Sequence, residues 1–406
     1  MAEQLPEHSP LGGSGAKRWM ACPGSVSLSK GIVDDESEFA ALGTAAHAFA
    51  ECALNQNSDA FSGIGSHYAA SNKTFYPEFW AKAELPDDAI LMDKDMADAV
   101  QTYLDAVRLW HPERNQGNSW VEKPFYCSDL HKHFHGMSDF VHVDDANRTL
   151  HVWDYKHGAG IIVEVEENPQ GMYYACGILE QLDLWDKIDN IVIHIAQPRG
   201  WHSDGPIRQW EISTEDLSDW PDDVLLPAME RALVSRETSS GEHCRFCPAR
   251  SHACPQLMGD MEELQIMTEL AEKGADALTD EQVGKFMDLF IKAKIVNTAA
   301  VKTAFSRMSA GKKIPGFQLS TGRKNRTWKE GAEKAIKAKF GKAAMTDPVL
   351  KSPSQIEAMP EGGTLAAQWA YKPPGALTVT PSSDSRPAVN RDTKSLFKPV
   401  SKGKQK

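Results

Sequence analysis

The sequence lacks any apolar run long enough to cross a membrane, and its first residues, MAEQLPEHSPLGG, contain neither a basic nor an apolar segment. A membrane span needs about 20 consecutive apolar residues, and a secretory signal needs a basic segment followed by an apolar one. We therefore expect no membrane association and a cytoplasmic location. The phosphate-binding motif G-x-x-x-x-G-K-S/T is also missing, which argues against an ATP-driven motor.

Positive charge is scarce over most of the chain and concentrated near its end. The 406 residues carry a net charge of −12, yet from Gly311 onward 19 Lys and Arg stand against 7 Asp and Glu. That region carries +12, so the first 310 residues carry −24. An acidic body binds DNA through local basic grooves or a bound metal, whereas the basic end could add affinity that is independent of DNA sequence. A soluble disordered extension explains the same charge.

Hydrophobic periodicity predicts the main elements. Apolar runs and alternation predict three strands besides a central hairpin: Ser119–Cys127, Asn190–Ala196 and Ile207–Ile212. Apolar residues at helical spacing predict six helices: Glu38–Leu54, Met96–Trp110, Glu166–Leu182, Asp222–Ser235, Leu278–Met308 and Trp328–Phe340. Thr279 and Gln282 have the spacing of a capping box at the start of the fifth helix. Residues 56–92 show no clear pattern.

The central hairpin is predicted over His133–Gly158, where two alternating segments flank a turn at Asp144–Asn147. The first strand carries Asp139, and the second ends in Asp154 and Lys156. Successive side chains of a strand point to opposite faces, so Asp154 and Lys156 share a face, and the hairpin can bring Asp139 close to them. Two carboxylates and an ammonium are costly to desolvate together unless a divalent cation lies between the carboxylates. A surface hairpin with charged ends is the alternative.

This hairpin resembles the core of the PD-(D/E)XK nucleases, with Asp139 as the first acid and Asp154-x-Lys156 as the second half of the motif. The predicted order helix, strand, strand, strand, helix, strand matches the shared core of this superfamily and does not depend on the motif letters. The resemblance implies an α/β fold in which helices flank a mixed central sheet. Beyond this core, the helical periodicity of Leu278–Met308 and Trp328–Phe340 predicts a helical C-terminal extension.

Two further motifs resemble the RecB-like branch of these nucleases. The segment GTAAHAFAE places His47 and Glu51 one turn apart on a helix. Gln170 and Tyr174 have the Q-x-x-x-Y spacing of that branch on a later helix. A satisfied interior histidine and an ordinary helix surface beside a packed aromatic are the alternatives for these two motifs.

The resemblance implies a Mg²⁺- or Mn²⁺-dependent DNA exonuclease. It assigns these metal ligands: His47, Asp139, Asp154 and the backbone carbonyl of Tyr155. Lys156 would orient or help deprotonate the attacking water, and Gln170 and Tyr174 would position the DNA strand. Glu51 is an outer-shell candidate below His47, and Glu122 is a packing or outer-shell carboxylate on the preceding strand.

A second candidate site contains these cysteines: Cys22, Cys244, Cys247 and Cys254. Three of them are spaced by two and then six residues on a turn-rich segment, which is a strong metal signal that needs a fourth ligand. One cysteine before the core and three after it is similar to the RecB- and AddB-like exonucleases with an iron–sulfur staple, which implies a 4Fe–4S cluster. A structural zinc with His243 or His252 is the alternative. The other cysteines are expected to be buried thiols: Cys52, Cys127 and Cys176.

We expect a flexible N-terminus over 1–13, a nuclease domain over 14–258, a helical extension over 259–342, and a linker with a basic, disordered tail over 343–406. The expected partners are linear DNA ends and a recombination or replication protein. The segments SGAKRWMACPGS and SSDSRPAV also resemble an uncharacterised group of phage-encoded proteins, for which the cytoplasm would be that of the host. A non-catalytic DNA-binding or recombination-partner protein that keeps the fold is the alternative function.

Overall fold

The computed structural model describes residues 9–32, 38–77, 84–114, 117–251, 254–272, 274, 276, 278–321, 327–329, 331–346, 349–350, 353, 356, 362–371, 377–381 and 388–389. The chain divides into two compact units, Met1–Lys292 and Ala293–Lys406. The boundary lies within helix α9 (Asp280–Ser309) and not near residue 258, so helix α8 (Pro255–Ala271) belongs to the first unit.

The first unit is an α/β structure built on a mixed five-stranded sheet in the order β4-β5-β6-β7-β8. Its strands are β4 (Ser119–Tyr126), β5 (His135–Asp144), β6 (Thr149–Tyr155), β7 (Asn190–Ala196) and β8 (Ile207–Ser213). Only β6 and β7 pair in parallel, because helix α5 (Pro169–Gln181) connects them as a crossover. The predicted strands and the predicted hairpin are confirmed.

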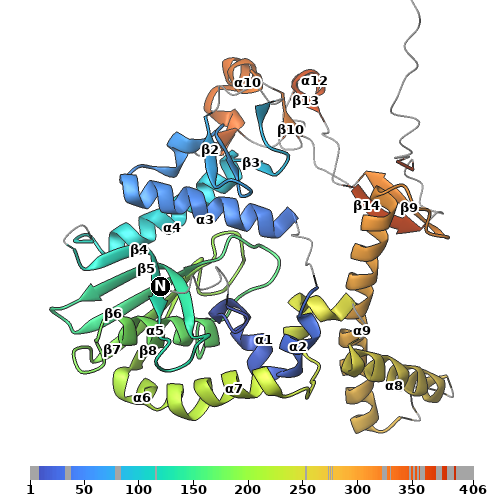
Figure 1. Ribbon diagram of the computed structural model, residues 1–406. Coiled ribbons are helices and arrows are strands. Elements are labelled where there is room, and N and C mark those ends of the chain that lie inside the picture. Colours follow the sequence, from blue (N-terminus) through green and yellow to red (C-terminus); the bar gives the residue numbers. More distant parts are fainter. Residues whose placement is uncertain are drawn as a thin grey trace, which may run out of the picture. The chain divides into compact units, whose positions relative to one another are not determined.

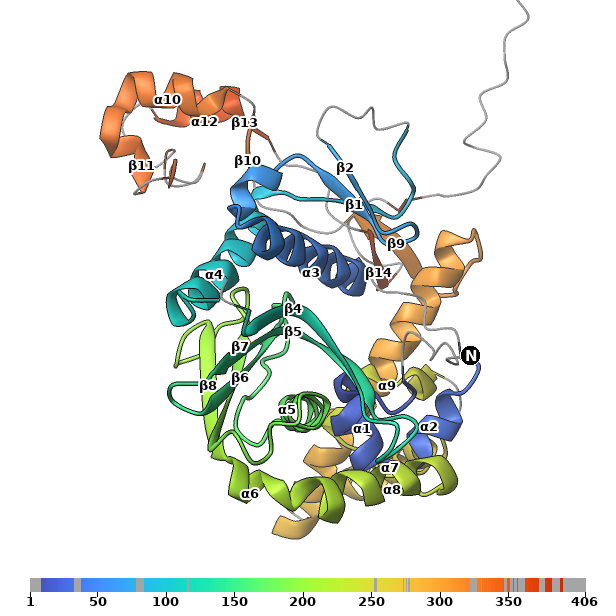
Figure 2. The ribbon, with the colours of Figure 1, turned by 60° about the vertical axis from the view of Figure 1, so that its left-hand side comes forward.

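Helix α5 packs closely against one face of this sheet, and Figures 1 and 2 show it inside the curve of the strands. Asn168 caps the helix by accepting hydrogen bonds from the backbone N–H groups of Gln170 and Gly171 at 3.0 and 3.1 Å. A β-carbon at Gly171 would lie 2.5 Å from Ile193, and one at Gly177 would overlap the ring of Phe125. Glycine therefore sets how near the helix can approach the sheet.

Helices α3 (Glu38–Gln56) and α4 (Lys94–Trp110) cover the other face (Figure 2). They share a buried cluster with Phe140, Trp153 and Tyr155 of the sheet. Asp93 caps α4 by accepting from the backbone N–H of Met96 at 2.8 Å. Both helices confirm the sequence prediction to within a few residues.

The stretch without a clear pattern forms a small antiparallel sheet in the order β2-β1-β3. Its strands have three residues each: β1 (His67–Ala69), β2 (Thr74–Tyr76) and β3 (Ala89–Leu91). A short 3₁₀ turn over Ala60–Gly63 precedes them. Strands of this length contain too few residues to show a period of two.

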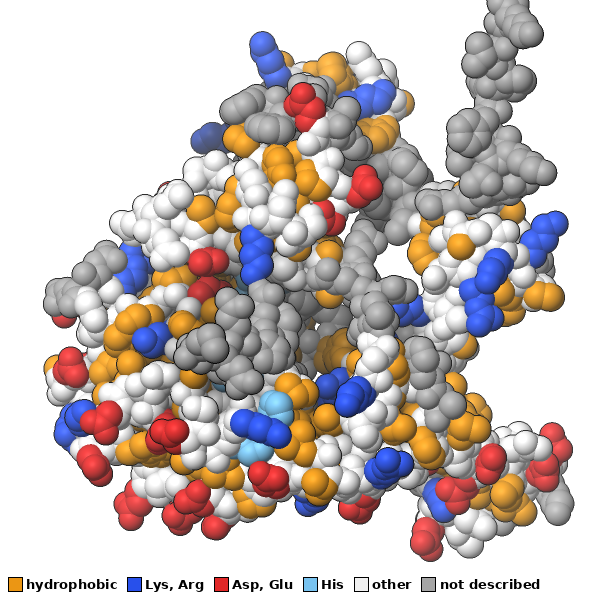
Figure 3. Space-filling model, viewed as in Figure 1, with side chains coloured by type: hydrophobic (Ala, Val, Ile, Leu, Met, Phe, Trp, Pro, Cys, Tyr) orange, Lys and Arg blue, Asp and Glu red, His pale blue; other side chains and the backbone are white. Residues whose placement is uncertain are grey.

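The segment after residue 12 packs against the helices that follow the five-stranded sheet. Short helices α1 (Ala16–Ala21) and α2 (Gly24–Ser29) follow a 3₁₀ turn at Gly13–Gly15. After β8 come α6 (Thr214–Ser218), a π-helical turn (Pro221–Leu225) and α7 (Leu226–Val234). The guanidinium of Arg231 donates to the carbonyl of Met20 at 3.2 Å. Figure 3 shows acidic side chains along the lower edge, over α6 and the segment that follows.

Residues 9–13, part of the segment expected to be flexible, pack against the core in the structure. Leu11 is completely buried in the core on the α5 side of the sheet. The hydroxyl of Ser9 donates to the carbonyl of His133 at 2.7 Å. An apolar side chain and one long-range hydrogen bond thus order a segment whose composition is typical of a loop. Residues 1–8 lie outside the described residues.

The second unit begins within α9, a helix whose start in the first unit has the predicted capping box. The backbone N–H of Thr279 donates to Gln282 Oε1 at 2.9 Å, and that of Gln282 donates to Thr279 Oγ1 at 3.3 Å. The remaining described elements are β9 (Phe317–Thr321), β10 (Thr327–Trp328), α10 (Ala332–Phe340), a 3₁₀ turn (Gly341–Ala344), β11 (Met345–Thr346), β12 (Val349–Leu350), α12 (Gly362–Trp369), β13 (Ala370–Tyr371) and β14 (Leu377–Pro381).

The expectation of a linker from residue 343 onward does not hold for α12 or β14. Strand β14 pairs antiparallel with β9, and its alternating Leu377-Thr-Val379-Thr is the pattern of a half-buried strand. Residues 390–406 lie outside the described residues. Among the helices of the described residues, we find none with both the length and the apolar character needed to cross a membrane.

Candidate functional site

Three ligand side chains meet where strands β5 and β6 separate. The β5–β6 ladder runs from Asp144–Thr149 to Phe140–Trp153 and stops there. Beyond it, Asp139 Oδ2 accepts the backbone N–H of Tyr155 at 2.6 Å, so a carboxylate takes the place of a strand partner. From α3, His47 Nδ1 lies 3.4 Å from Asp139 Oδ1. Because β5 and β6 no longer pair at this point, the second carboxylate oxygen of Asp139 can contact His47 on α3.

Glu122 is the third member of this group, and its position depends on an irregular backbone. The β4–β5 register pairs Val121 with Phe140 and Lys123 with Ser138, which leaves Glu122 opposite Asp139. Glu122 has φ of 49°, a left-handed conformation that costs of order 1–3 kcal/mol for such a residue. One ligand atom from each of His47, Glu122 and Asp139 lies within 4.8 Å of the others.

The pKa values of these three side chains depend on burial and on one another. Burial, together with the charge of Asp139, raises the pKa of Glu122 to about 8, although His47 opposes this shift. Burial alone would lower the pKa of His47, but the charge and hydrogen bond of Asp139 raise it to about 9. Burial would likewise raise the pKa of Asp139, and His47 instead holds it below its ordinary value. At neutral pH the imidazolium of His47 is therefore paired with the carboxylate of Asp139 beside a protonated Glu122, and a divalent ion would replace the protons of His47 and Glu122.

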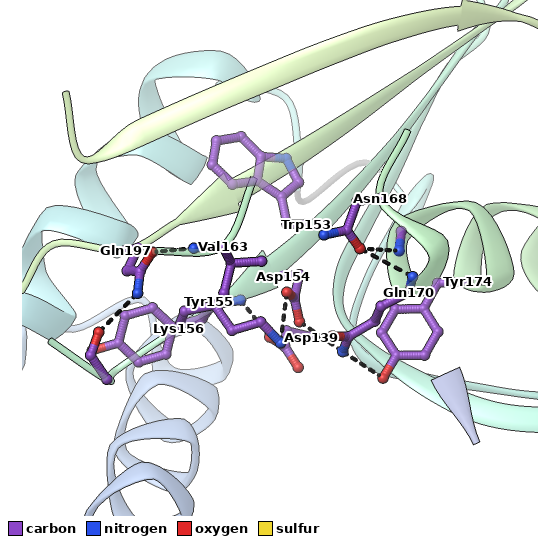
Figure 4. A network of polar contacts seen from close by, with 12 residues as sticks. Asp139, Trp153, Asp154, Tyr155, Lys156, Val163, Asn168, Gln170, Tyr174 and Gln197 are labelled. Atoms are coloured by element: carbon purple, nitrogen blue, oxygen red, sulfur yellow. Dashed lines mark hydrogen bonds and ion pairs between the residues drawn. The ribbon is translucent and has the colours of Figure 1, made fainter. Parts of the chain in front are cut away.

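A chain of polar contacts lies beside this group, and Figure 4 shows its members pointing toward one another. Lys156 Nζ lies 2.8 Å from Asp154 Oδ2 and donates to Gln170 Oε1 at 2.8 Å. The amide nitrogen of Gln170 donates to Asp154 Oδ1 at 3.1 Å and to the hydroxyl of Tyr174 at 3.0 Å. Burial raises the pKa of Asp154, and Lys156 only partly offsets the rise. The lysine is therefore held in one orientation by two partners.

The structure separates the predicted site residues into two sets. His47 and Asp139 come together as expected, and the carboxylate of Glu122 lies close enough to them to be a third candidate ligand. Asp154 lies in the polar chain with Lys156, and Tyr155 contributes its backbone N–H to Asp139. The ring of Tyr155 packs edge-on against His47 at a centroid distance of 5.3 Å. Glu51 is exposed on α3 and does not belong to the group.

The four cysteines of the second candidate site are all buried. Cys22 directly follows α1, Cys244 and Cys247 lie at the 3₁₀ turn Glu242–Phe246, and Cys254 directly precedes α8. His243 is hydrogen-bonded to the thiols of Cys22 and Cys244, which raises its pKa to about 10. The backbone N–H of Ser239 donates to Cys22 Sγ at 3.4 Å, which ties the two ends of the domain together.

The spacing of these cysteines allows a test of fit. Tetrahedral zinc with Zn–S bonds of about 2.3 Å would bring its sulfur ligands within about 3.8 Å of one another. Over the described residues, the groups of three or more ligands within 4.8 Å contain no cysteine. The four thiols therefore do not have the spacing of a tetrahedral zinc site in this structure. His252 lies outside the described residues.

The other three cysteines occupy varied environments. Cys127 and Cys176 are buried as expected, and burial raises the pKa of both thiols, that of Cys127 to about 12. Cys52 on α3 is only partly buried.

Sequence reasoning missed a further group of possible ligands, which consists of His111, His151 and His194. No motif spacing links residues so far apart, and the only sequence signal is their alternation with apolar residues in two of the strands.

The fold and the site define an α/β protein in which His, Glu and Asp side chains that could hold a metal ion meet where two strands of the central sheet separate. The chain matches, over residues 8–387, the model of the family described as protein of unknown function (DUF2800). The match covers most of the 406 residues, so the chain belongs to this family.

Proposed function

We propose that the protein is a Mg²⁺- or Mn²⁺-dependent deoxyribonuclease of the PD-(D/E)XK type, an exonuclease that acts on linear DNA ends in phage or bacterial recombination, replication or end processing. One observation carries the proposal: Asp139 and the pair Asp154–Lys156 lie where β5 and β6 separate, with His47 contacting Asp139 from α3. Hard oxygen ligands suit these ions and leave coordination positions for water and a phosphate oxygen.

The residues of this chain divide the work as follows. His47, Glu122 and Asp139 would hold the ion, and Asp154 and the carbonyl of Tyr155 can add ligands because each carboxylate oxygen has more than one lone pair. A bound Mg²⁺ or Mn²⁺ would lower the pKa of the attacking water and stabilise the charge on the phosphate.

Lys156 is oriented for the same reaction by its neighbours. Asp154 and Gln170 hold its ammonium at 2.8 Å each, so it can orient the water or meet the charge that develops on the phosphate. Tyr174 accepts from Gln170 and so fixes the amide that holds the lysine. Gln170 and Tyr174 lie one turn apart on α5 and would position the DNA strand. Gln170 would also hold the ammonium of Lys156.

We infer a 4Fe–4S cluster at Cys22, Cys244, Cys247 and Cys254, with structural zinc as the alternative. The segment around Cys22 is already hydrogen-bonded to the region after α7, through Gly24 N–H to Glu237 O at 2.8 Å and Ser239 Oγ to Ala21 O at 2.6 Å. A metal group there would close a chain segment of more than two hundred residues, which restricts the unfolded chain.

DNA is the proposed partner, and the charges suggest where it binds. The acidic edge over α6 would repel phosphates, whereas a bound divalent ion and Lys156 would attract them (Figure 3). The basic region from Gly311 onward would add salt-dependent affinity.

The test is cleavage of end-labelled linear DNA and of closed circular DNA with Mg²⁺ or Mn²⁺. We expect wild type to degrade the linear DNA and Lys156→Ala to be inactive, with folding checked by circular dichroism. Lys187→Ala is the matched control, because Lys187 also lies 2.8 Å from an aspartate but is exposed. Full cleavage by folded Lys156→Ala would refute the assignment. No cleavage by wild type on any single- or double-stranded end would favour a non-catalytic DNA-binding protein.

A further inference from the structure

A row of buried histidines crosses the sheet on the face covered by α3 and α4. His142 of β5 pairs with His151 of β6, and His194 of β7 pairs with Trp153 of β6. His111, which directly follows α4, packs over the row with its ring centroid 4.7 Å from that of His151. His111 is 2% exposed and His194 is 0% exposed. Histidine is only moderately often buried, so four buried imidazoles next to one another are unusual in a protein interior.

Three of these rings present nitrogen atoms to one another. One nitrogen from each of His111, His151 and His194 lies within 4.8 Å of the others. His151 Nδ1 lies 3.0 Å from His194 Nε2, so a single proton is shared between the two rings. The other nitrogen of His194, Nδ1, has no hydrogen-bond partner although the residue is completely buried. The group therefore contains a buried nitrogen atom that makes no hydrogen bond in the structure.

We propose that His111, His151 and His194 bind one divalent transition-metal ion of the zinc, cobalt or nickel class. Imidazole nitrogen suits these borderline ions and not Mg²⁺ or Ca²⁺, and three histidines with an open position form a known type of zinc site. The site is separate from the carboxylate group at His47 and does not depend on the proposed nuclease activity.

The protons balance without any loss from the rings. An ion bound to His151 Nδ1 and His194 Nε2 displaces the shared proton, which moves to the other nitrogen of the ring that carried it. Each neutral ring then holds one proton, on Nε2 of His151 and on Nδ1 of His194. The ion would join α4 to two strands, since His111 follows the helix and the others belong to β6 and β7. Its effect would thus include stabilisation of the folded chain.

Trp153 forms a hydrogen bond to His111 that would compete with binding of the ion. This competition can be tested. The indole N–H of Trp153 donates to His111 Nε2 at 2.9 Å, which occupies a lone pair of that ring. If the ion binds Nε2, this N–H must move away; if it binds Nδ1, the proton of His111 must lie on Nε2, where it faces the indole N–H. In both cases Trp153 loses its acceptor when the ion binds. Removing the N–H should therefore favour the ion.

The experiment uses the full chain with its cysteine site assembled and Co²⁺ as the probe, in metal titrations followed by absorption spectroscopy. We expect His151→Gln and His194→Gln to lose one equivalent of Co²⁺ whose spectrum shows nitrogen and oxygen ligands without a thiolate band. His135→Gln is the matched control, because His135 is also buried with an unpartnered Nε2 but lies outside the group. Equal Co²⁺ binding by wild type and folded His151→Gln would overturn the proposal.

Trp153→Phe keeps the proposal testable if the histidine variants fail to fold. It should bind Co²⁺ up to about tenfold more tightly than wild type, because one hydrogen bond no longer competes with the ion. X-ray absorption of the wild-type complex should show imidazole scattering from this equivalent. Unchanged or weaker binding by folded Trp153→Phe would refute the three-histidine assignment, as would a spectrum without imidazole. Failure of DNA cleavage would not bear on either result.

Discussion

Two groups of ligands on one sheet show how the same side chain acquires opposite properties. His47 is half-buried and His111 is buried, and desolvation would lower the pKa of each. Next to Asp139, the pKa of His47 nevertheless rises to about 9. The pKa of His111 falls to about 2, because burial is reinforced by other imidazoles, His151 and His142. Of these two histidines, only His47 has a neighbouring carboxylate that outweighs desolvation, so only His47 is protonated at neutral pH.

The difference extends to the ions that the two groups can bind. The group at His47 contains two carboxylates and is partly open to solvent, which suits a hard ion that keeps water ligands. The group at His111 contains only imidazoles and is closed, which suits a borderline ion. The two sites should therefore respond independently to metals and to mutations.

The largest effect is expected for Asp139→Asn. Loss of the carboxylate shared by His47 and the Tyr155 N–H should lower cleavage by about 10³-fold or more and abolish tight Mn²⁺ binding. Co²⁺ binding at His111, His151 and His194 should stay unchanged. Cleavage kinetics and Mn²⁺ electron paramagnetic resonance measure the first effect, and the Co²⁺ spectrum the second. Simultaneous loss of both metals would show that the groups are not independent.

The next prediction concerns the four-cysteine site and is tested with Cys22→Ala. This variant should lose the iron–sulfur colour together with stability and solubility, because the link between α1 and the region after α7 is broken. Iron and sulfide analysis of anaerobically purified protein measures the cluster. Cys176→Ala is the control, since that buried thiol lies in α5 and should leave the iron content unchanged. Zinc without iron or sulfide in wild type would exclude the cluster.

A smaller effect, with a definite sign, is expected for Glu122→Gln in metal-free protein. The pKa of Glu122 is raised from 4.5 to about 8 in the folded state, so its neutral form stabilises the fold below about pH 4.5. That stability is lost as the pH rises toward 8, where the charged form is disfavoured. Glutamine cannot ionise, so the metal-free variant should be more stable than wild type at pH 8, by about 1–3 kcal/mol.

Urea unfolding at pH 5 and pH 8 with a chelator measures this difference. With Mn²⁺ present the order should reverse, because wild type gains binding energy that Glu122→Gln lacks. The same pH dependence in both proteins would show that Glu122 is not the group that loses stability. The test distinguishes a ligand from a packing carboxylate, because only a ligand gives the reversal.

The smallest effect is expected for Ser119→Ala, next to the histidine row. The hydroxyl of Ser119 shares a hydrogen bond of 2.7 Å with His142 Nδ1, and its loss should lower stability by about 0.5–1.5 kcal/mol. His142 is not among the three ligands, so Co²⁺ binding should be unaffected. Thermal or urea unfolding and the same titration measure both quantities. A lost equivalent of Co²⁺ would mean that His142 belongs to the site.

The sequence determined a large part of the fold by local patterns. Alternation over His133–Gly158 and the apolar run Asn190–Ala196 predicted three strands of the sheet, and the capping box at Thr279 and Gln282 marked the start of α9. The spacing of Asp154 and Lys156 placed the two side chains together, since a strand alternates every residue. These properties depend on neighbours in the chain, which a sequence displays directly.

Only the tertiary structure decided which side chains form the two ligand groups. Glu122 joins His47 because an irregular φ and the register of β4 place it opposite Asp139, and neither can be read from residue types. The histidines come from a helix end and two strands, and only the packing of α4 on the sheet brings His111 to the others. Ligand geometry depends on distances between elements far apart in the chain, and these are fixed by packing and strand register.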